Sequence, residues 1–325
     1  KLAFAAAEKI YDCRASLCDL FAAESPENVI FCQNATHALN IAILSLARDG
    51  AHFICSDMEH NSVRRPLAYL ARERGCSYSV FDSHVLDPNR NAQKICRSIS
   101  SLVRPKTVAV ISTACPNICS ARMPLDEIGE LCRREGLHFI VDGAQGAGHF
   151  PIDMKRSGIS ALALPGHKGL LGPQGSGVLI ISSSFPARSL TFGGSGSASL
   201  DAEMPRELPE MLEAGTLSTP AIVGLEAGIK ALQSIGLQSI ASHEEMLFKK
   251  TLRLLSEIRG VTVYAPRHAG SVLSFNIDGI PSDRVANLLS DSDICVRGGF
   301  HCNPMAHAVL GSDRGGSVRA SFSPF

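Results

Sequence analysis

The chain has 325 residues, and its 31 Lys and Arg residues are matched by 31 Asp and Glu residues. This balance argues against a protein that binds nucleic acid or an anionic membrane through bulk positive charge. The hydrophobic share of 45% allows a sizeable core and excludes a disordered, collagenous or coiled-coil chain. At about 150 residues per domain, the length suggests two domains.

Eleven cysteines are the unusual feature of the composition. Most of them lie in apolar runs such as 53–55 and 294–296, where a free cysteine packs as a small hydrophobic residue. The odd number, with no export signal and no C-x-x-C pair, favours a reducing cytosol, so we expect a cytoplasmic protein without a structural metal site. No apolar stretch of about 18 residues predicts a transmembrane helix. The chain starts at Lys1 inside a helical pattern and stops at Phe325, and we interpret both ends as trimmed.

Short β-rich runs alternate with helical patterns over the first half of the chain. Helices are predicted over 1–23, 36–48, 62–74, 91–102 and 125–135, and strands over 29–32, 53–56, 79–81, 107–113, 138–142, 161–164 and 177–181. Repeated β-α-β units imply an α/β fold with a mostly parallel sheet between helices. Such sheets bind ligands at the carboxyl ends of their strands.

The pattern changes in the last third of the chain. Residues 220–259 are helical with a break at Gly236, and they are followed by predicted strands over 261–264, 271–277 and 294–296 and a helix over 282–289. This order indicates a smaller α+β domain, so we divide the chain into a large domain of residues 1–235 and a small domain of residues 236–325. Residues 193–218 are rich in Gly and Ser and then in Pro and Glu, which predicts a long loop of the kind that often has a function.

Asp142 and Lys168 form the strongest chemical signal. Asp142 ends a strongly apolar predicted strand, and Lys168 follows a second apolar run and a Pro-Gly turn. A lysine amine on a sharp turn can form a Schiff base with pyridoxal 5′-phosphate (PLP), and a nearby aspartate can keep the pyridine nitrogen protonated. Taken singly, such an aspartate is as often a helix cap or a metal ligand, and such a lysine is usually a surface residue.

Seven motifs resemble, in the same order, those of the class V branch of the fold-type I PLP-dependent enzymes, and most closely those of the cysteine desulfurases. They are Asn34-Ala-Thr36-His-Ala-Leu-Asn40, Glu59-His60-Asn61, Asp142-Gly-Ala-Gln145, Gly166-His-Lys168, Gly215-Thr-Leu217, Arg297-Gly-Gly-Phe-His-Cys302 and Arg319-Ala-Ser-Phe. The resemblance runs nearly end to end. It implies the fold-type I fold, PLP as cofactor, a homodimer with active sites at the subunit interface, and conversion of L-cysteine to L-alanine with a persulfide that passes to an acceptor, for which a sulfur-acceptor protein is a candidate.

The resemblance assigns four residues to the cofactor ring. Lys168 would bond covalently to PLP and later move the Cα proton of the substrate. Asp142 would hold the pyridine N–H, and Gln145 would hydrogen-bond the phenolate oxygen. His60 would stack on the ring and assist proton transfer, although the residues alone favour a core histidine at a strand-to-helix turn.

The resemblance assigns four more residues to the cofactor phosphate. They are Ala35 and Thr36 at a helix N-terminus, His167, and Thr216 of the neighbouring subunit. Thr36 alone would be interpreted as a helix N-cap, a role compatible with phosphate binding. Pro165 stands where most relatives have Ser or Thr, so one phosphate contact of the family is missing.

Cys302 is the candidate nucleophile because it follows a Gly-Gly loop and lies close in sequence to Arg297 and His301, which can lower a thiol pKa. The other ten cysteines lack this setting. The resemblance assigns Asn117, Arg297 and Arg319 to the substrate, with Arg319 as a bidentate clamp for its carboxylate. The alternatives are a turn residue at Asn117 and intramolecular ion pairs at the two arginines.

Three other functions fit parts of the pattern. A selenocysteine lyase would share every cofactor residue, and a class V aminotransferase would leave Cys302 without a role. A non-catalytic scaffold of the same fold is favoured only by Pro165 and the apparently trimmed ends.

Overall fold

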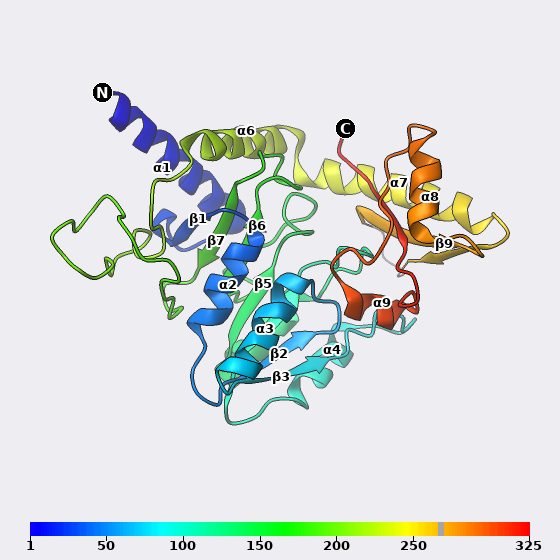
Figure 1. The fold of residues 1–325 in the computed structure, drawn as a ribbon, viewed down its shortest axis with the longest axis horizontal. Helices are drawn as coiled ribbons and strands as arrows, with labels where there is room; N and C mark the ends of the chain where they lie inside the picture. Colours follow the sequence, from blue (N-terminus) through cyan, green and yellow to red (C-terminus); the bar gives the residue numbers. More distant parts are fainter. Residues whose placement is uncertain (266–269) are drawn as a thin grey trace.

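The computed structural model describes residues 1–265 and 270–325. Across those residues, seven strands form one sheet in the order β1-β7-β6-β5-β4-β2-β3 (Figure 1). The strands are β1 (Val29–Cys32), β2 (His52–Ser56), β3 (Ser77–Phe81), β4 (Thr107–Thr113), β5 (His138–Asp142), β6 (Ala161–Pro165) and β7 (Gly177–Ile181). Strands β2 to β6 pair in parallel, whereas β7 runs antiparallel to both β6 and β1. The sheet is therefore mixed but mostly parallel, as the β-α-β pattern predicts.

Helices cover both faces of this sheet. They are α1 (Leu2–Phe21), α2 (Ala35–Ser45), α3 (Asn61–Glu73), α4 (Ala92–Ser100), α5 (Leu125–Glu135) and α6 (Thr219–Ile235). Side chains of α2 and α3 pack on one face, and those of α1, α4, α5 and α6 pack on the other. A three-layer domain results, because each face of the sheet is apolar and must be covered.

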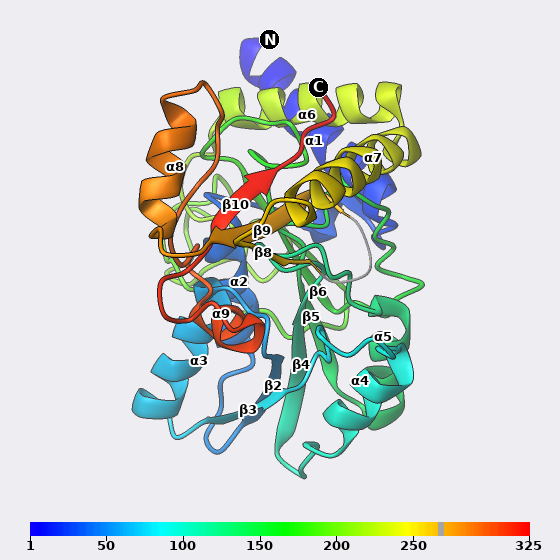
Figure 2. The same ribbon diagram turned by 90° about the vertical axis from the view of Figure 1, so that its right-hand side faces the viewer.

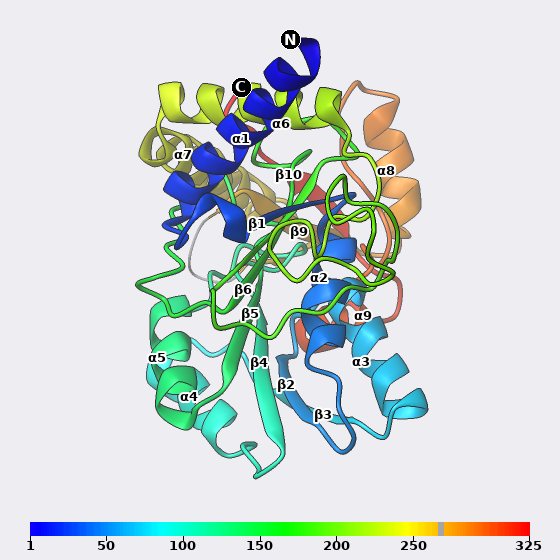
Figure 3. The same ribbon diagram turned by 90° about the vertical axis from the view of Figure 1, so that its left-hand side faces the viewer.

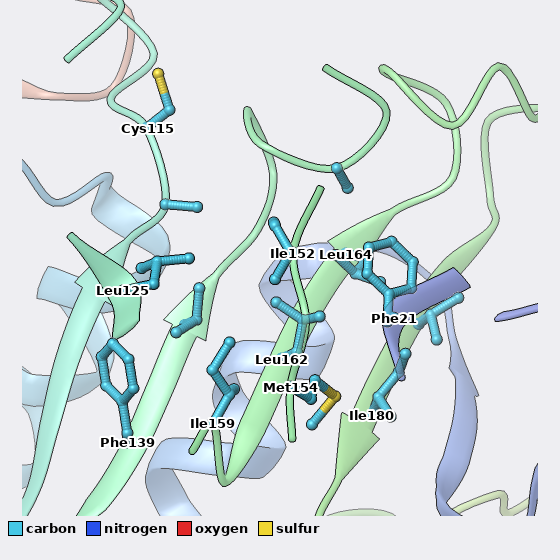
Figure 4. Close-up of a cluster of buried hydrophobic side chains, with 14 of the residues drawn as sticks. Phe21, Cys115, Leu125, Phe139, Ile152, Met154, Ile159, Leu162, Leu164 and Ile180 are labelled. Atoms are coloured by element: carbon cyan, nitrogen blue, oxygen red, sulfur yellow. The ribbon is translucent and has the colours of Figure 1, made fainter. Parts of the chain in front are cut away.

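The strand residues divide between the two faces with a period of two, as strand geometry requires. In β5, Phe139 and Val141 join the core beneath α5, whereas Ile140 joins the core beneath α2 and α3. Figure 4 shows part of the first core, where Phe139, Leu162 and Ile180 come from three different strands. Each such side chain contributes about 1.5–3 kcal/mol of burial free energy.

A smaller unit follows the helix break at Gly236, whose φ of 87° suits glycine. It contains α7 (Leu237–Ser256), α8 (Ser282–Ser290), α9 (Pro304–Leu310) and an antiparallel sheet in the order β10-β9-β8, with β8 (Val261–Tyr264), β9 (Val272–Ile277) and β10 (Val318–Ser321) (Figure 2). Its core contains Phe248, Leu273, Phe275, Val285 and Val318. The α+β character that we predict for this part of the chain is confirmed.

Two sequence predictions for the small unit need correction. The predicted strand over 294–296 is wrong, because Ile294 is 49% exposed and Cys295 is also exposed. Asp293 has a positive φ of 59°, which breaks an extended conformation, and only Arg297 pairs, in an isolated bridge with Arg319. Helix α9 is absent from the predictions, although Asn303-Pro304 is a typical helix start.

The long loop predicted around 193–218 lies within the connection between β7 and α6 (Figure 3). It exposes large apolar side chains, with Phe192 at 76% and Leu200 fully accessible. In the described part of the chain, no helix combines the length and apolarity needed to cross a membrane.

Candidate active site

A cavity of about 190 Å³ lies at the carboxyl ends of β2, β4, β5 and β6. The order of the strands reverses between β2 and β4, and parallel sheets bind ligands at such a point. The cavity is lined by Asn34, Ala35, Thr36, Met58, His60, Ser62, Thr113, Cys115, Asn117, Asp142, Ala144, Gln145, Pro165, His167 and Lys168. Most of the residues assigned to the cofactor by sequence therefore meet in one place.

Asp142 and Lys168 face this cavity from neighbouring strand ends. Asp142 ends β5 and is 4% exposed, and one of its carboxylate oxygens accepts the N–H of Ala144 at 2.9 Å. Lys168 follows β6, lines the cavity and is partly accessible to solvent. Burial lowers the pKa of Lys168, and the Asp142 carboxylate partly opposes that shift. A lysine with a lowered pKa has a larger fraction of neutral, nucleophilic amine.

His60 is joined to the start of α3 and to the start of α2 through Ser62. The N–H of Ser62 donates to His60 Nδ1 at 3.1 Å, so the proton of the neutral imidazole is on Nε2. The Ser62 hydroxyl lies 2.8 Å from Nδ1 and 2.7 Å from the Thr36 hydroxyl. Burial lowers the pKa of His60, and Lys168 lowers it further, whereas Asp142 opposes them. His60 is therefore neutral near pH 7, with an N–H at Nε2.

The N-terminus of α2 forms one end of the cavity. Asn34, not Thr36, caps this helix, because the Asn34 side chain accepts the N–H of His37 at 2.9 Å. The N-cap interpretation of Thr36 is thus wrong, and its hydroxyl is free to serve other partners besides Ser62. The backbone of Asn34 packs closely against Gly177, where only glycine fits, since a Cβ there would lie 2.5 Å from the Asn34 backbone. Free N–H groups at a helix N-terminus favour a bound anion.

Cys302 lies outside the cavity, in an adjoining outer groove of about 550 Å³. The outer groove is lined by Thr36, Asn40, Leu44, His60, Asn61, Ser62, Arg65, Pro66, Tyr69 and Cys302. Thr36, His60 and Ser62 line both spaces, and we call these three residues the shared wall of the cavity that contains Lys168 and the groove that contains Cys302. The remaining described cysteines are buried or half-buried, apart from the exposed Cys295.

Arg319 and Arg297 line neither the cavity nor the outer groove. They come from paired backbone positions, with the N–H of Arg319 donating to the Arg297 carbonyl at 2.8 Å. Arg319 Nη1 donates to the Asn117 carbonyl at 3.2 Å, whereas its Nε is buried without a partner. Burial and the nearby Arg297 lower the pKa of Arg319. A half-buried guanidinium with an unused donor suits a carboxylate ligand.

The four other predicted residues, Gln145, Thr216, His167 and Asn117, lie in different settings. Gln145 lines the cavity directly after β5, whereas Thr216 is exposed on the loop before α6 and does not line the cavity of its own chain. His167 lines the cavity beside Lys168, and burial lowers its pKa. Asn117 lines the cavity, and its amide is hydrogen-bonded to the Cys302 loop.

The sequence alone assigned no role to four residues of this region: Ser62, Glu59, Cys115 and Asn303. Glu59 is fully buried, accepts the N–H of Thr113 at 2.7 Å, and burial raises its pKa to about 8. Cys115 lines the cavity as a buried thiol, and its position directly after β4 is the signal that could have found it. Ser62 could have been found from its place in the first turn of a helix that begins next to His60.

The residues present fit PLP. The cavity combines a lysine of lowered pKa, a buried carboxylate and the N–H groups at the N-terminus of α2 that Asn34 does not cap, and these match the aldehyde, the pyridine N–H and the phosphate. Pro165 supplies no donor to that phosphate, but the Thr36 and Ser62 hydroxyls lie at the same end of the cavity. Fold and cavity together define the class of the protein, a fold-type I PLP-dependent enzyme fold with a lysine-bearing site.

Comparison with known proteins narrows this class. The sequence profile of the family Aminotransferase class-V matches residues 1–325, and the chain belongs to that family. Its relatives include a probable cysteine desulfurase of Methanothermobacter thermautotrophicus, 33% identical with 98% of this chain and 80% of the relative covered. A probable cysteine desulfurase of Pyrococcus abyssi is 32% identical, with 99% and 80% covered.

Solved structures agree with these relatives. The apo cysteine desulfurase of Thermococcus onnurineus NA1 superposes with a TM-score of 0.89 at 32% identity, over 99% of this chain and 80% of that one. The Escherichia coli cysteine desulfurase CsdA, at 24% identity and a TM-score of 0.89 over the same shares, shows the common fold. Members of the family use PLP, and a C-DES variant of the same fold has glycine covalently linked to its PLP cofactor.

Proposed function

We propose that this protein is a PLP-dependent cysteine desulfurase that converts L-cysteine to L-alanine and leaves the sulfur on Cys302 as a persulfide. The observation that supports the proposal most directly is the shared wall of Thr36, His60 and Ser62, which puts an exposed thiol next to the cavity of Lys168 and Asp142. The relatives named cysteine desulfurase agree with this chemistry.

The chain offers a distinct group to each part of the cofactor. Lys168 Nζ would bond to the aldehyde carbon, Asp142 would accept the pyridine N–H, and Gln145 would face the phenolate oxygen. The phosphate would be held by the N–H groups of Ala35 and Thr36, the Thr36 hydroxyl and His167, and by Thr216 of a second copy of the chain. When bound, PLP supplies an electron sink that acidifies the Cα–H bond of an attached amino acid.

The remaining groups would bind the substrate and transfer protons. Arg319, with Arg297 beside it, would bind the substrate carboxylate through its unused donor. Lys168, once displaced by the substrate amine, would be the base that takes the Cα proton. His60 would stack over the ring as a neutral imidazole, with its Nε2 proton available to the reacting groups.

Cys302 completes the reaction from the outer groove. Its thiolate attacks the substrate sulfur, a new S–S bond forms, and the C–S bond breaks with its electron pair remaining on the carbon side. Protonation of that carbon gives alanine, so L-cysteine and the enzyme thiol become L-alanine and an enzyme persulfide without an external oxidant. The persulfide is then open to an acceptor, because Cys302 is exposed.

The test uses the purified protein with PLP, L-cysteine and dithiothreitol. Wild type should release alanine and sulfide, and mass spectrometry should find one extra sulfur on the Cys302 peptide. Cys302→Ala should keep the visible PLP band but lose the persulfide, whereas Lys168→Ala should lose the covalent band and at least about 10²-fold in turnover. Wild-type alanine release by Cys302→Ala, a preference for selenocysteine, or transamination of an α-keto acid would contradict the proposal.

A further inference from the structure

Three consecutive residues of the Cys302 loop are hydrogen-bonded to the large domain. The carbonyl of His301 accepts the side-chain N–H of Asn117 at 2.7 Å, and the carbonyl of Cys302 accepts the N–H of Asn61 at 2.9 Å. The side chain of Asn303 donates to the carbonyl of Met58 at 2.9 Å. Their partners follow β2 and β4, so the loop is attached across the point where the strand order reverses.

Asn303 and Asn117 form what we call the amide clamp, because the two side chains also bond to each other. Asn303 Nδ2 donates its second hydrogen to Asn117 Oδ1 at 2.9 Å, and Asn303 Oδ1 accepts the N–H of Ala306 at the start of α9. The Asn303 side chain is fully buried, and Asn117 is 9% exposed. Both donors and the acceptor of Asn303 are thus in use, which leaves its amide only one orientation.

The loop needs such attachment because its backbone is strained. His301 and Cys302 have positive φ angles of 49° and 57°, which disfavour residues other than glycine. This pair of left-handed residues turns the His301 ring inward, where it is 4% exposed, and the Cys302 side chain outward into the outer groove. Strained backbone persists only where surrounding contacts fix it.

We propose that Asn303 is a positioning residue: through the amide clamp it fixes the Cys302 loop against the large domain and keeps the thiol beside the wall that the cavity and the outer groove share. The proposal rests on the proposed function for its effect on turnover, but the attachment of the loop can be tested without any activity. Asn303 does not touch the reacting atoms and acts through the backbone of Cys302.

Asn303→Asp separates the clamp from the helix cap. Aspartate keeps the acceptor that caps α9, since Asp and Asn are equivalent N-caps. It lacks both donors and sets a negative charge against the oxygens of Met58 and Asn117. If the Asn117 amide turned to donate to the new carboxylate, it would lose its bond to His301, so one attachment is lost in either case.

The experiment compares holoenzymes of wild type, Asn303→Asp, Asn303→Ala and the control Asn91→Asp, which changes an N-cap asparagine of α4 away from the site. With Asn303→Asp we expect kcat for L-cysteine to fall by about 10- to 100-fold while KM and the PLP band stay unchanged. Hydrogen exchange at the Asn61 amide should accelerate, and alkylation of Cys302 should change several-fold relative to the exposed Cys295 in the same molecule.

Asn303→Ala, which adds no charge, should change exchange and alkylation in the same direction, and Asn91→Asp should change neither. If hydrogen exchange at the Asn61 amide and alkylation of Cys302 were the same in Asn303→Asp as in wild type, the proposed role of the amide clamp would be overturned. Loss of the PLP band together with turnover would also overturn it, because Asn303 would then be a general structural residue. A wild-type protein without desulfurase activity would refute the proposed function, and the exchange and alkylation results would still decide the clamp.

Discussion

Glu59 is a buried carboxyl group close enough to the Asp142 carboxylate of the site to interact with it. It is fully buried behind the cavity, its pKa is raised mainly by burial, and the Asp142 carboxylate raises it further. One oxygen accepts two hydrogen bonds, from Ser56 and Thr113, and the other is buried without a partner. At neutral pH Glu59 is therefore protonated, so it adds no second negative charge next to Asp142.

This protonation gives the native state a predictable dependence on pH. The folded-state pKa of about 8 lies above the ordinary value of 4.5, so only the folded state holds the proton between these values. The stability that this proton contributes is complete below pH 4.5 and is lost as pH rises through 8. Glu59→Gln is neutral at every pH. Its free energy of unfolding should therefore rise relative to that of wild type by about 1.4 kcal/mol per pH unit across this range.

Thermal unfolding of wild type and Glu59→Gln between pH 5 and pH 8.5 measures this difference. The exposed Glu130, changed to Gln, provides the control and should show no such trend. A constant difference between Glu59→Gln and wild type over the whole range would contradict the assigned protonation.

Sequence reasoning reached the residues whose roles depend on their place along the chain. Asp142 and Lys168 each follow an apolar strand, and parallel strands bring their carboxyl ends together. Asn303 could not be found in this way, because its role depends on hydrogen bonds to segments far away in sequence. The partners of Asn303 are Met58 and Asn117, and no local pattern connects these residues.

Among the elements, helix α2 combines an ordinary cap with the site that we propose for the phosphate. Asn34 caps the helix as a neutral residue and lines the cavity. Asn34→Asp should keep or raise stability, because a carboxylate caps well and interacts favourably with the helix dipole. The same negative charge should repel the phosphate and weaken PLP binding by about tenfold, or about 1.4 kcal/mol.

Titration of the apo-protein with PLP, followed by the visible band, measures this effect. Asn91→Asp, at the corresponding position of α4, serves again as the control and should bind PLP like wild type. If Asn34→Asp and wild type bound PLP with equal affinity, the phosphate site that we propose at the N-terminus of α2 would be wrong.

The elements with strong periodicity were the easiest to predict. The bounds of β4, α5 and β5 match the predictions, because buried strands and an amphipathic helix are specified locally. The segment over 294–296 has the apolar residues of a strand but no neighbour with which to pair, and pairing is not visible in a local pattern. The Gly236 break is confirmed as a helix boundary, and we propose it as the boundary between residues 1–235 and 236–325.

At the scale of the whole molecule, the position of Thr216 leads to a prediction about assembly. Thr216 is exposed and does not reach the cavity of its own chain, and the same long loop exposes Phe192 and Leu200. Exposed apolar side chains of this size favour an interface. We propose a homodimer in which this loop supplies Thr216 to the phosphate site of the partner.

Mixed dimers test this arrangement. Lys168→Ala and Thr216→Ala chains, each impaired alone at limiting PLP, should regain turnover when unfolded and refolded together. Each mixed dimer would then contain one site with Lys168 from one chain and Thr216 from the other. Mixing Lys168→Ala chains with chains that have both changes should restore no turnover. If the first mixture also stayed inactive while forming dimers, Thr216 would not act across the interface.

The shared wall of Thr36, His60 and Ser62 has a consequence for how the substrate and the sulfur acceptor reach the proposed enzyme. The cavity and the outer groove share these three lining residues, and Lys168 lines the first space whereas Cys302 lines the second. Alanine would leave from the lysine side, whereas the sulfur would stay on Cys302 and face outward. In the proposed enzyme, an acceptor would therefore approach the persulfide through the outer groove, without entering the cavity that Lys168 lines.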